Sequence, residues 1–243
     1  MIRTLASTSV LGLVPALLLV SACGGPPPEP VAPVVEAPPP PRHSPKLAVQ
    51  SELGEIDSGA TDKVFAELQP KFMACYQDGQ RRVEYLSGDV KFFLRVAPDG
   101  STRWVFMEES TLGDRATERC MLDVMSSARW PAPSGGEAEV HKGFGFDPPS
   151  NVRPPLEWST DRIAETLGKS GDDVNRCKGG ASGTFHVTAY VQPHGKQHGR
   201  VQAAGVAPPN KDGEDKIDCI VDAVKKLKVP SPGSWAAKVS FIL

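Results

Sequence analysis

The chain has 243 residues, of which 40% are hydrophobic and 23% charged, and its formal net charge is −2. This length suits one or two domains. The near balance of charges excludes the basic stripe that nucleic-acid binding needs, so we expect no nucleic-acid partner.

Residues 1–22 are predicted to be a secretory signal peptide. Arg3 supplies the positive charge, and the uncharged apolar run from Val10 to Val20 is too short to span a bilayer comfortably. The run ends in Val-Ser-Ala-Cys23, which resembles the bacterial lipobox, whose cysteine becomes the acylated first residue of the mature chain. We therefore expect a lipid anchor on Cys23; the alternative is an ordinary signal peptide with a cysteine present by chance.

The expected location of the protein in the cell follows from the predicted lipid anchor. Gly24, in place of an aspartate, favours the outer membrane by the sorting rule of enteric bacteria, with the chain facing the periplasm. Residues 23–58 are rich in proline and favour an extended polyproline conformation. They are predicted to be a spacer between the membrane and the folded part, although recognition by a partner is the alternative.

The first domain is predicted at 59–147. Its opening helix, from about Thr61 to Tyr76, contains Pro70, which predicts a kink or two short helices. Thr111 is a plausible cap for a second helix. The predicted strands are 89–97 and 101–108, joined by a Pro-Asp-Gly turn, and 138–146 after the second helix.

Residues 148–157 are predicted to be a short, stiff linker because they contain four prolines. The second domain, 158–243, repeats the order of elements. We expect a helix at 160–177, a hairpin at 183–207, a helix at 214–228 and a last strand at 236–243.

The two domains are related by an internal repeat. Residues 88–100 align without a gap with residues 183–195, with glycine at both ends and apolar residues at alternate positions. One cysteine precedes each copy (Cys75, Cys177) and one follows it (Cys120, Cys219). Four cysteines allow three pairings. The repeat selects Cys75–Cys120 and Cys177–Cys219, each closing a loop of roughly 45 residues and contributing about 4 kcal/mol.

The predicted fold class is α+β, with helix–strand–strand–helix–strand in each domain and both helices on one face of a three-stranded sheet. The other face and an edge then have no element to cover them. On the uncovered faces we expect possible binding residues at Lys91, Phe93 and Arg95, and at His186, Thr188 and Tyr190. For the face of the first domain, the alternative is that it packs against the other domain. For the face of the second domain, the alternative is an ordinary sheet surface with no binding role.

Catalytic chemistry is not indicated. The sequence has no nucleophile elbow, no glycine-rich phosphate loop after a strand and no C-x-x-C pair. The cysteine spacing does not suit a metal, and His194 and His198 fall at a predicted hairpin tip. We therefore predict no catalytic residue, no metal site and no cofactor.

A series of motifs runs through the first domain in the order Cys75-Tyr76, Gly88-x-Val-x-Phe92, an Asp-Gly turn, Cys120-Met121 and a Trp-Pro ending. This order resembles the AgmX/PglI C-terminal domain family, which is similar to the C-terminal domain of TonB. The second copy resembles the family more loosely, because Tyr does not follow Cys177. The resemblance implies a tandem TonB-C-terminal-like fold in an envelope protein of myxobacterial type. TonB itself uses a transmembrane N-terminal helix, where this chain has the predicted lipid anchor.

The expected function is a non-catalytic lipoprotein of the cell envelope that binds or scaffolds other envelope proteins. One alternative is an adaptor of a TonB-like transport or motility machine that spans the envelope. Another is a small-ligand binder in a cleft between the domains.

Overall fold

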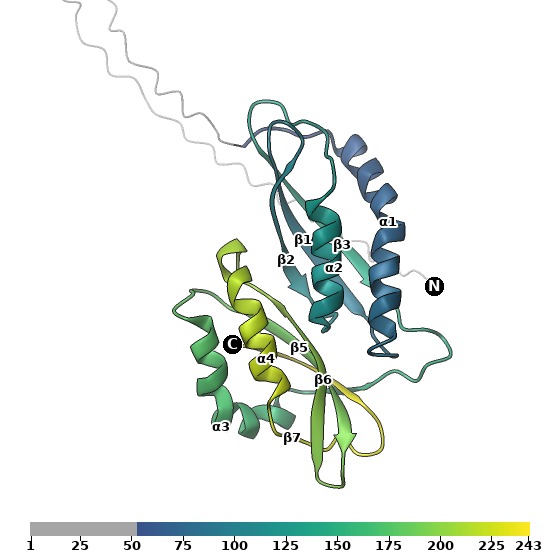
Figure 1. The fold of residues 1–243 in the computed structure, drawn as a ribbon, viewed down its shortest axis with the longest axis vertical. Coiled ribbons are helices and arrows are strands. Elements are labelled where there is room, and N and C mark those ends of the chain that lie inside the picture. The colour runs from purple at the N-terminus through teal and green to yellow at the C-terminus, as the bar shows by residue number, and fades with distance from the viewer. Residues whose placement is uncertain (1–52) are drawn as a thin grey trace, which may run out of the picture. The chain divides into compact units, whose positions relative to one another are not determined.

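The computed structural model describes residues 53–243 (Figure 1). The predicted signal peptide, Cys23 and all but the last residues of the predicted tether lie outside this range. In the described part, four α-helices accompany one sheet of three strands and one of five. The predicted α+β class is therefore confirmed. No helix among these residues is long and apolar enough to cross a membrane.

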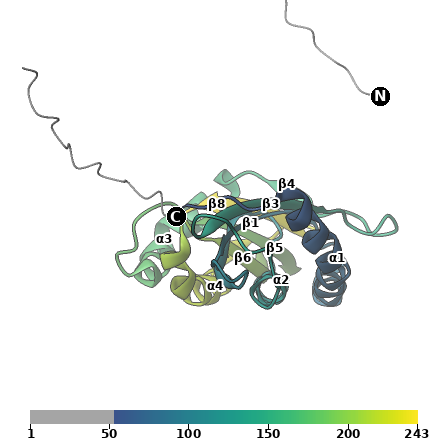
Figure 2. The ribbon, with the colours of Figure 1, turned by 90° about the horizontal axis from the view of Figure 1, so that it is seen from above.

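The N-terminal half has the predicted helix–strand–strand–helix–strand order. Its elements are α1 (Ser58–Gln80), β1 (Gly88–Val96), β2 (Thr102–Ser110), α2 (Arg115–Ser126) and β3 (Ala138–Phe146). The sheet is antiparallel in the order β2-β1-β3. Alternate residues of β1, from Val90 to Val96, are buried on the face that α1 and α2 cover (Figure 2). The core of this half therefore lies between the helix pair and the sheet.

Two details of these helices differ from the prediction. The chain stays helical through Pro70, so α1 is one helix and not two short ones. The cap of α2 is Asp114 instead of Thr111, because the Asp114 carboxylate accepts a hydrogen bond from the Thr117 amide. Gly113, at φ 74°, makes the sharp turn that places Asp114 at the helix start.

The C-terminal half contains more strands than predicted. Its elements are β4 (Leu156–Trp158), α3 (Asp161–Lys178), β5 (His186–His194), β6 (His198–Ala207), the 3₁₀ helix η1 (Lys211–Lys216), α4 (Ile217–Lys225), β7 (Val229–Pro230) and β8 (Ala237–Ile242). The sheet order is β4-β8-β5-β6-β7, so the predicted three-stranded sheet is wrong for this half. The additional strands β4 and β7 have three and two residues, too few to show an alternating pattern.

Both predicted disulfides are confirmed. Cys75 of α1 is bonded to Cys120 of α2, and Cys177 of α3 to Cys219 of α4. Each bond joins the two helices that cover one sheet, so each half has its own covalent link.

The two halves share part of their core. Tyr190, Ala203 and Ala236 of the C-terminal half are buried in the same cluster as the aromatic core of the N-terminal half. Residues 53–243 accordingly belong to one compact unit. We call the region of contact between the two halves the junction.

Candidate interaction surface

One face of the N-terminal sheet is turned away from α1 and α2, and we call it the open face. Cross-strand pairing places neighbouring residues of the three strands on it. Its members are Lys91, Phe93 and Arg95 of β1, Trp104 and Phe106 of β2, and Glu139, His141, Gly143 and Gly145 of β3. The three predicted binding residues of this half therefore lie on one face, as expected from strand alternation.

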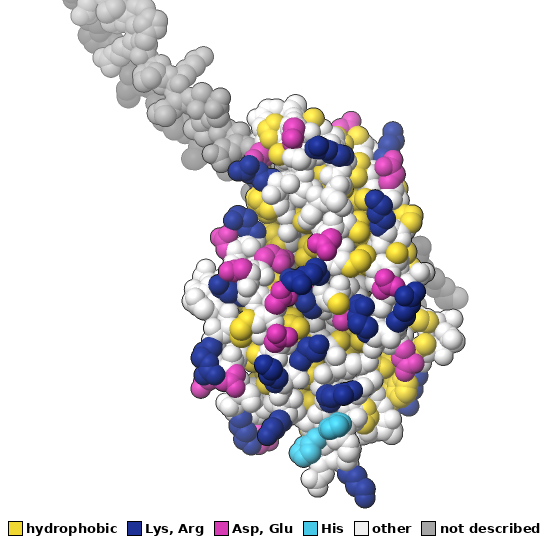
Figure 3. All heavy atoms as spheres, in the orientation of Figure 1, with side chains coloured by type: hydrophobic (Ala, Val, Ile, Leu, Met, Phe, Trp, Pro, Cys, Tyr) yellow, Lys and Arg dark blue, Asp and Glu magenta, His cyan; other side chains and the backbone are white. Residues whose placement is uncertain are grey.

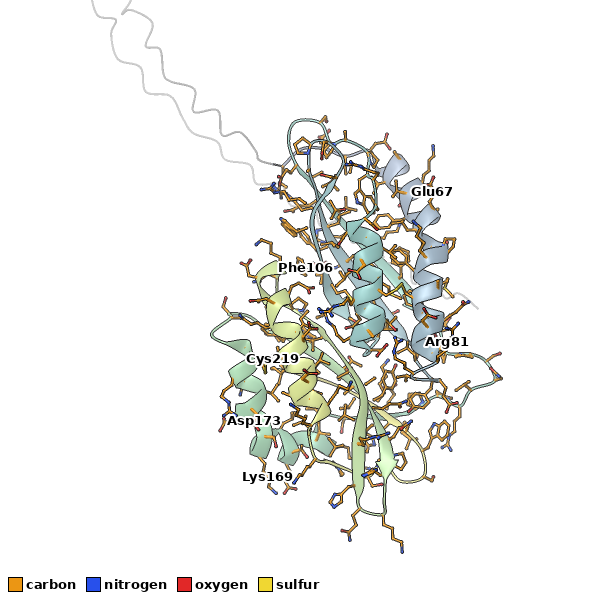
Figure 4. All side chains as sticks on the ribbon, viewed as in Figure 1. Glu67, Arg81, Phe106, Lys169, Asp173 and Cys219 are labelled. Atoms are coloured by element: carbon orange, nitrogen blue, oxygen red, sulfur yellow. A yellow bond between two sulfur atoms is a disulfide. The ribbon has the colours of Figure 1, made fainter. Side chains whose placement is uncertain are left out.

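Aromatic rings occupy the centre of the open face. Phe93 stacks against Trp104 and Phe106, with ring centroids 5.0 and 5.2 Å apart, and the His141 ring meets it edge-on at 4.7 Å. Phe93 and Trp104 are half-buried, whereas Phe106 is buried beside the C-terminal half (Figure 4). Such ring pairs contribute about 0.5–1.5 kcal/mol beyond their burial, so the cluster holds this face rigid.

Lys91 and His141 are bound to carboxylates near one end of the cluster. The Lys91 ammonium lies 3.3 Å from both Glu108 and Glu109, and hydrogen bonds to these two residues raise its pKa. His141 Nδ1 lies 3.0 Å from the Glu108 carboxylate. These ion pairs are exposed, so they orient side chains more than they stabilise the fold.

Arg95 is held in a similar way at the other end. Its guanidinium donates to Glu137 at 2.8 Å and to Glu139 at 2.6 Å. Only 13% of the Arg95 side chain is exposed, so its position is fixed by these two carboxylates. With Lys91 and Arg95 both paired to carboxylates, the open face suits a largely uncharged partner segment flanked by polar groups.

A hollow lies beside Lys91 at one end of the open face, where β3 carries glycine at two positions. Gly143 lies opposite Lys91 and Gly145 opposite Asp89. The hollow has a volume of about 350 Å³ and is also lined by Glu109. A Cβ atom on Gly143 would come no closer than 3.7 Å to a backbone oxygen, so the space is free for a side chain.

The outer edge of β3 adjoins the same hollow. β3 has nine residues and pairs with β1 on its inner side. Within residues 53–243, no strand pairs along its outer side; one isolated bridge, Leu53 to Glu137, lies just before it. An edge of this length presents backbone N–H and C=O groups that can bind an extended chain.

The second predicted binding face is not open. Thr188 and Tyr190 are only 2% and 0% exposed, so the prediction of a free surface is wrong for both. The Tyr190 hydroxyl donates to the Ser87 carbonyl at 2.9 Å and accepts from the Ser87 amide at 3.1 Å. Thr188 lies against Gly113. The turns before β1 and before α2 thus cover this face.

His186 is the exception on that face. It is exposed and lines a hollow of about 650 Å³ with Ser240 and Ile242 on one side and Glu108 and Glu109 on the other. Of the three residues predicted in this half, His186 alone remains accessible.

Several members of the open face were missing from the predicted binding residues. The alternating pattern of the second strand already placed Trp104 and Phe106 on one face, and cross-strand pairing could have joined them to Phe93. No sequence signal marked His141 or Gly143, because their position depends on the register between β1 and β3.

The part of the chain that the structure describes contains no group of three or more His, Cys, Asp or Glu side chains that could hold a metal ion. His194 and His198 face each other as the last paired residues of the β5–β6 hairpin, and both are exposed. No family model, no curated protein and no solved structure matches this chain.

Proposed function

We propose that this chain is a non-catalytic lipoprotein of the cell envelope, anchored through Cys23 and facing the periplasm, that binds other envelope proteins. In this proposal the two halves are tandem domains of the TonB-C-terminal type. The element order of the N-terminal half and the two disulfides within the halves support that relationship. The extra strands of the C-terminal half are a departure from it.

The observation that carries the proposal is the nine-residue edge of β3, which has no partner strand among residues 53–243, beside the hollow lined by Gly143 and Gly145. An extended segment of a partner can add to this edge as a fourth strand through backbone hydrogen bonds. Its alternate side chains then project over the open face, where the hollow lined by Gly143, Lys91 and Glu109 accepts one of them. Affinity comes from the backbone and specificity from the hollow.

A small-ligand site between the halves is the less favoured alternative. A hollow of about 590 Å³ lies between α2 and α4, lined by Arg82, Arg115 and Arg119 among others. Each of these guanidinium groups is already bound to an aspartate of the protein, Asp114 or Asp218. A ligand would have to displace those ion pairs.

The test is crosslinking and affinity capture from intact envelopes with three forms of the chain. Gly143→Glu fills the hollow on the open face, where a Cβ atom meets only ordinary contacts. Gly168→Glu makes the same chemical change on α3, where nothing lies within 4 Å of a Cβ atom. We expect one protein to be captured by the wild type and by Gly168→Glu, and to be lost with Gly143→Glu.

Equal capture by all three forms would contradict the proposed surface. A circular dichroism melt of each variant shows that loss of capture is not loss of folding. Binding of the isolated partner segment, followed by the appearance of new protected amides in β3, would separate strand addition from contact with the face alone.

A further inference from the structure

A carboxyl group is buried at the junction. Glu118, near the start of α2, is only 1% exposed. Its Oε1 accepts a hydrogen bond from the Ser110 hydroxyl at 2.7 Å, and its Oε2 has no hydrogen-bond partner among the described residues. Ser110 and Glu118 both belong to the N-terminal half. Within that half, the Ser110 hydroxyl and the Gly113 backbone are the polar groups that favour the ionised carboxyl group by hydrogen bonding.

The C-terminal half covers this group with backbone. Gly205 of β6 lies so close that a Cβ atom on it would be 2.1 Å from Glu118 Oε1. The absence of a side chain at residue 205 therefore lets β6 lie directly against the Glu118 carboxyl group. When β6 is in place, water is excluded from the carboxyl group.

Acidic and basic side chains are mixed on the surface over α2 and α4 (Figure 3). Beside Glu118 in the chain, Arg115 lowers the pKa of Glu118 and Asp114 raises it. From the C-terminal half, Glu214 of η1 and Asp218 of α4 reach the same guanidinium, at 3.6 and 3.0 Å from Arg115.

The balance of these charges leaves Glu118 without a cation of its own. Arg119 also binds Asp218, and Asp114 is bound to Arg82. The Arg115 guanidinium therefore forms ion pairs with Asp218 and Glu214. Its positive charge also lowers the pKa of Glu118. A second buried oxygen, Oε1 of Glu214, likewise has no hydrogen-bond partner among residues 53–243.

We propose that Glu118 is a protonation switch for the docking of the two halves. The neutral carboxyl group fits beneath Gly205, whereas the ionised group favours a loosened junction in which water reaches it. The switch rests on three features of the structure: a buried carboxyl group with Gly205 of the other half packed on it, an oxygen without a hydrogen-bond partner among the described residues, and a neighbouring arginine already engaged by two other carboxylates. An ionised carboxylate held this way is costly unless it regains solvent.

The direction of the pH dependence follows from burial. Burial raises the pKa of Glu118 from 4.5 to about 7, with the Ser110 hydrogen bond and Arg115 acting in the opposite sense. The docked state therefore binds this proton more tightly than the open state does. Docking is strongest below about pH 4.5 and weakens as the pH rises through about 7, by roughly 300-fold once the pH is well above 7.

The other titratable groups at the junction affect docking either in the same pH range as Glu118 or outside that range. Burial also raises the pKa of Glu214, so its effect has the same sign as that of Glu118. The pKa of Asp218 is lowered, because Arg115 and Arg119 outweigh its burial, so Asp218 favours docking until the pH falls below about 4. Burial lowers the pKa of Lys238, which bonds to Ser87, and this favours docking only at alkaline pH.

Loosening of the junction requires no covalent change. The contacts across it include the bonds of Tyr190 to Ser87, of Gln202 to the Arg82 carbonyl and of Tyr85 to Gln202. Both disulfides lie within a half. Opening would uncover Thr188 and Tyr190, which the docked state buries.

The test is amide hydrogen exchange by NMR on the full chain from pH 4.5 to pH 8, corrected for the intrinsic pH dependence of exchange. The Ser87 amide reports the junction, since it donates across it to Tyr190. The Leu94 amide, inside the β1 ladder, reports the N-terminal sheet itself. We expect protection of Ser87 to fall by about two orders of magnitude between pH 4.5 and pH 7, with no matching loss at Leu94.

Glu118→Gln keeps the shape of the side chain and cannot ionise, so it should remove most of this pH dependence. Glu67→Gln, on an exposed carboxylate of α1 away from the junction, is the matched control and should keep it. Ser110→Ala removes the hydrogen bond that lowers the pKa of Glu118, so the midpoint should move to higher pH. An unchanged pH profile in Glu118→Gln overturns the proposal. If that variant does not fold, an unmoved midpoint in Ser110→Ala overturns it equally.

Discussion

At Gly205 the absence of a side chain allows strand β6 of one half to lie against the Glu118 carboxyl group of the other. We expect Gly205→Ala to lower the free energy of unfolding by about 1–3 kcal/mol, because the new methyl group collides with the buried Glu118 carboxyl group. Urea denaturation followed by circular dichroism measures this change.

Gly168→Ala is the matched control. Gly168 lies within α3, and nothing is within 4 Å of a Cβ atom placed on it. The same substitution should there raise the free energy of unfolding by about 0.5–1 kcal/mol, because alanine favours a helix over glycine. Equal effects at the two glycines would show that β6 does not press on Glu118.

Individual residues show where inference from the sequence succeeds. The alternation of Val90, Phe92, Leu94 and Val96 placed Lys91, Phe93 and Arg95 on the opposite face, because side chains of a strand alternate between faces. The same rule put His186, Thr188 and Tyr190 on one face but could not show what covers it. The partner of Tyr190, Ser87, is 103 residues away in the chain.

Among the elements, the disulfide-linked helix pairs were predictable and the short strands were not. The internal repeat indicates which cysteines belong together, because each copy carries two. By contrast, β4 and β7 are held by neighbours, β8 and β6, whose position depends on the completed fold. Their few residues contain no periodic signal of their own.

The disulfide that joins each pair of helices leads to a prediction about cysteine pairing and stability. We expect a non-reducing digest to link Cys75 only to Cys120, and Cys177 only to Cys219. Replacing Cys75 and Cys120 by alanine should cost about 2–5 kcal/mol of stability, since a loop of 45 residues is released in the unfolded chain. Thermal unfolding of the double variant measures this, and a loss below 1 kcal/mol would contradict it.

For the whole molecule, the shared core predicts cooperative unfolding. Tyr190, Ala203 and Ala236 complete the core of the other half, so neither half keeps its buried surface alone. Near pH 5, where the junction is strongest, calorimetry should show one transition with equal calorimetric and van't Hoff enthalpies. Tyr190→Asp should divide this transition or lower its midpoint by several degrees, since it buries a charge at the junction. Two separate transitions in the wild type would contradict the shared core.

The sequence was least informative about how the two halves differ and how they contact each other. Two similar copies predict two similar domains, yet the halves differ in their sheets and in what covers them. The face that is open in one half is occupied in the other by Ser87 and Gly113. Such asymmetry arises from contacts between the copies, and a repeat seen along one chain does not encode it.

The position of β8 has a consequence for the order in which the fold is assembled. This strand comes last in chain order, yet it lies in the interior of its sheet, between β4 and β5. All described strands of the N-terminal sheet fall within residues 88–146, so they can pair before the rest of the chain has been synthesised. The second sheet lacks one of its interior strands until residues 237–242 arrive. During that interval one side of β5 has no partner strand, and an unpaired strand of this kind favours aggregation.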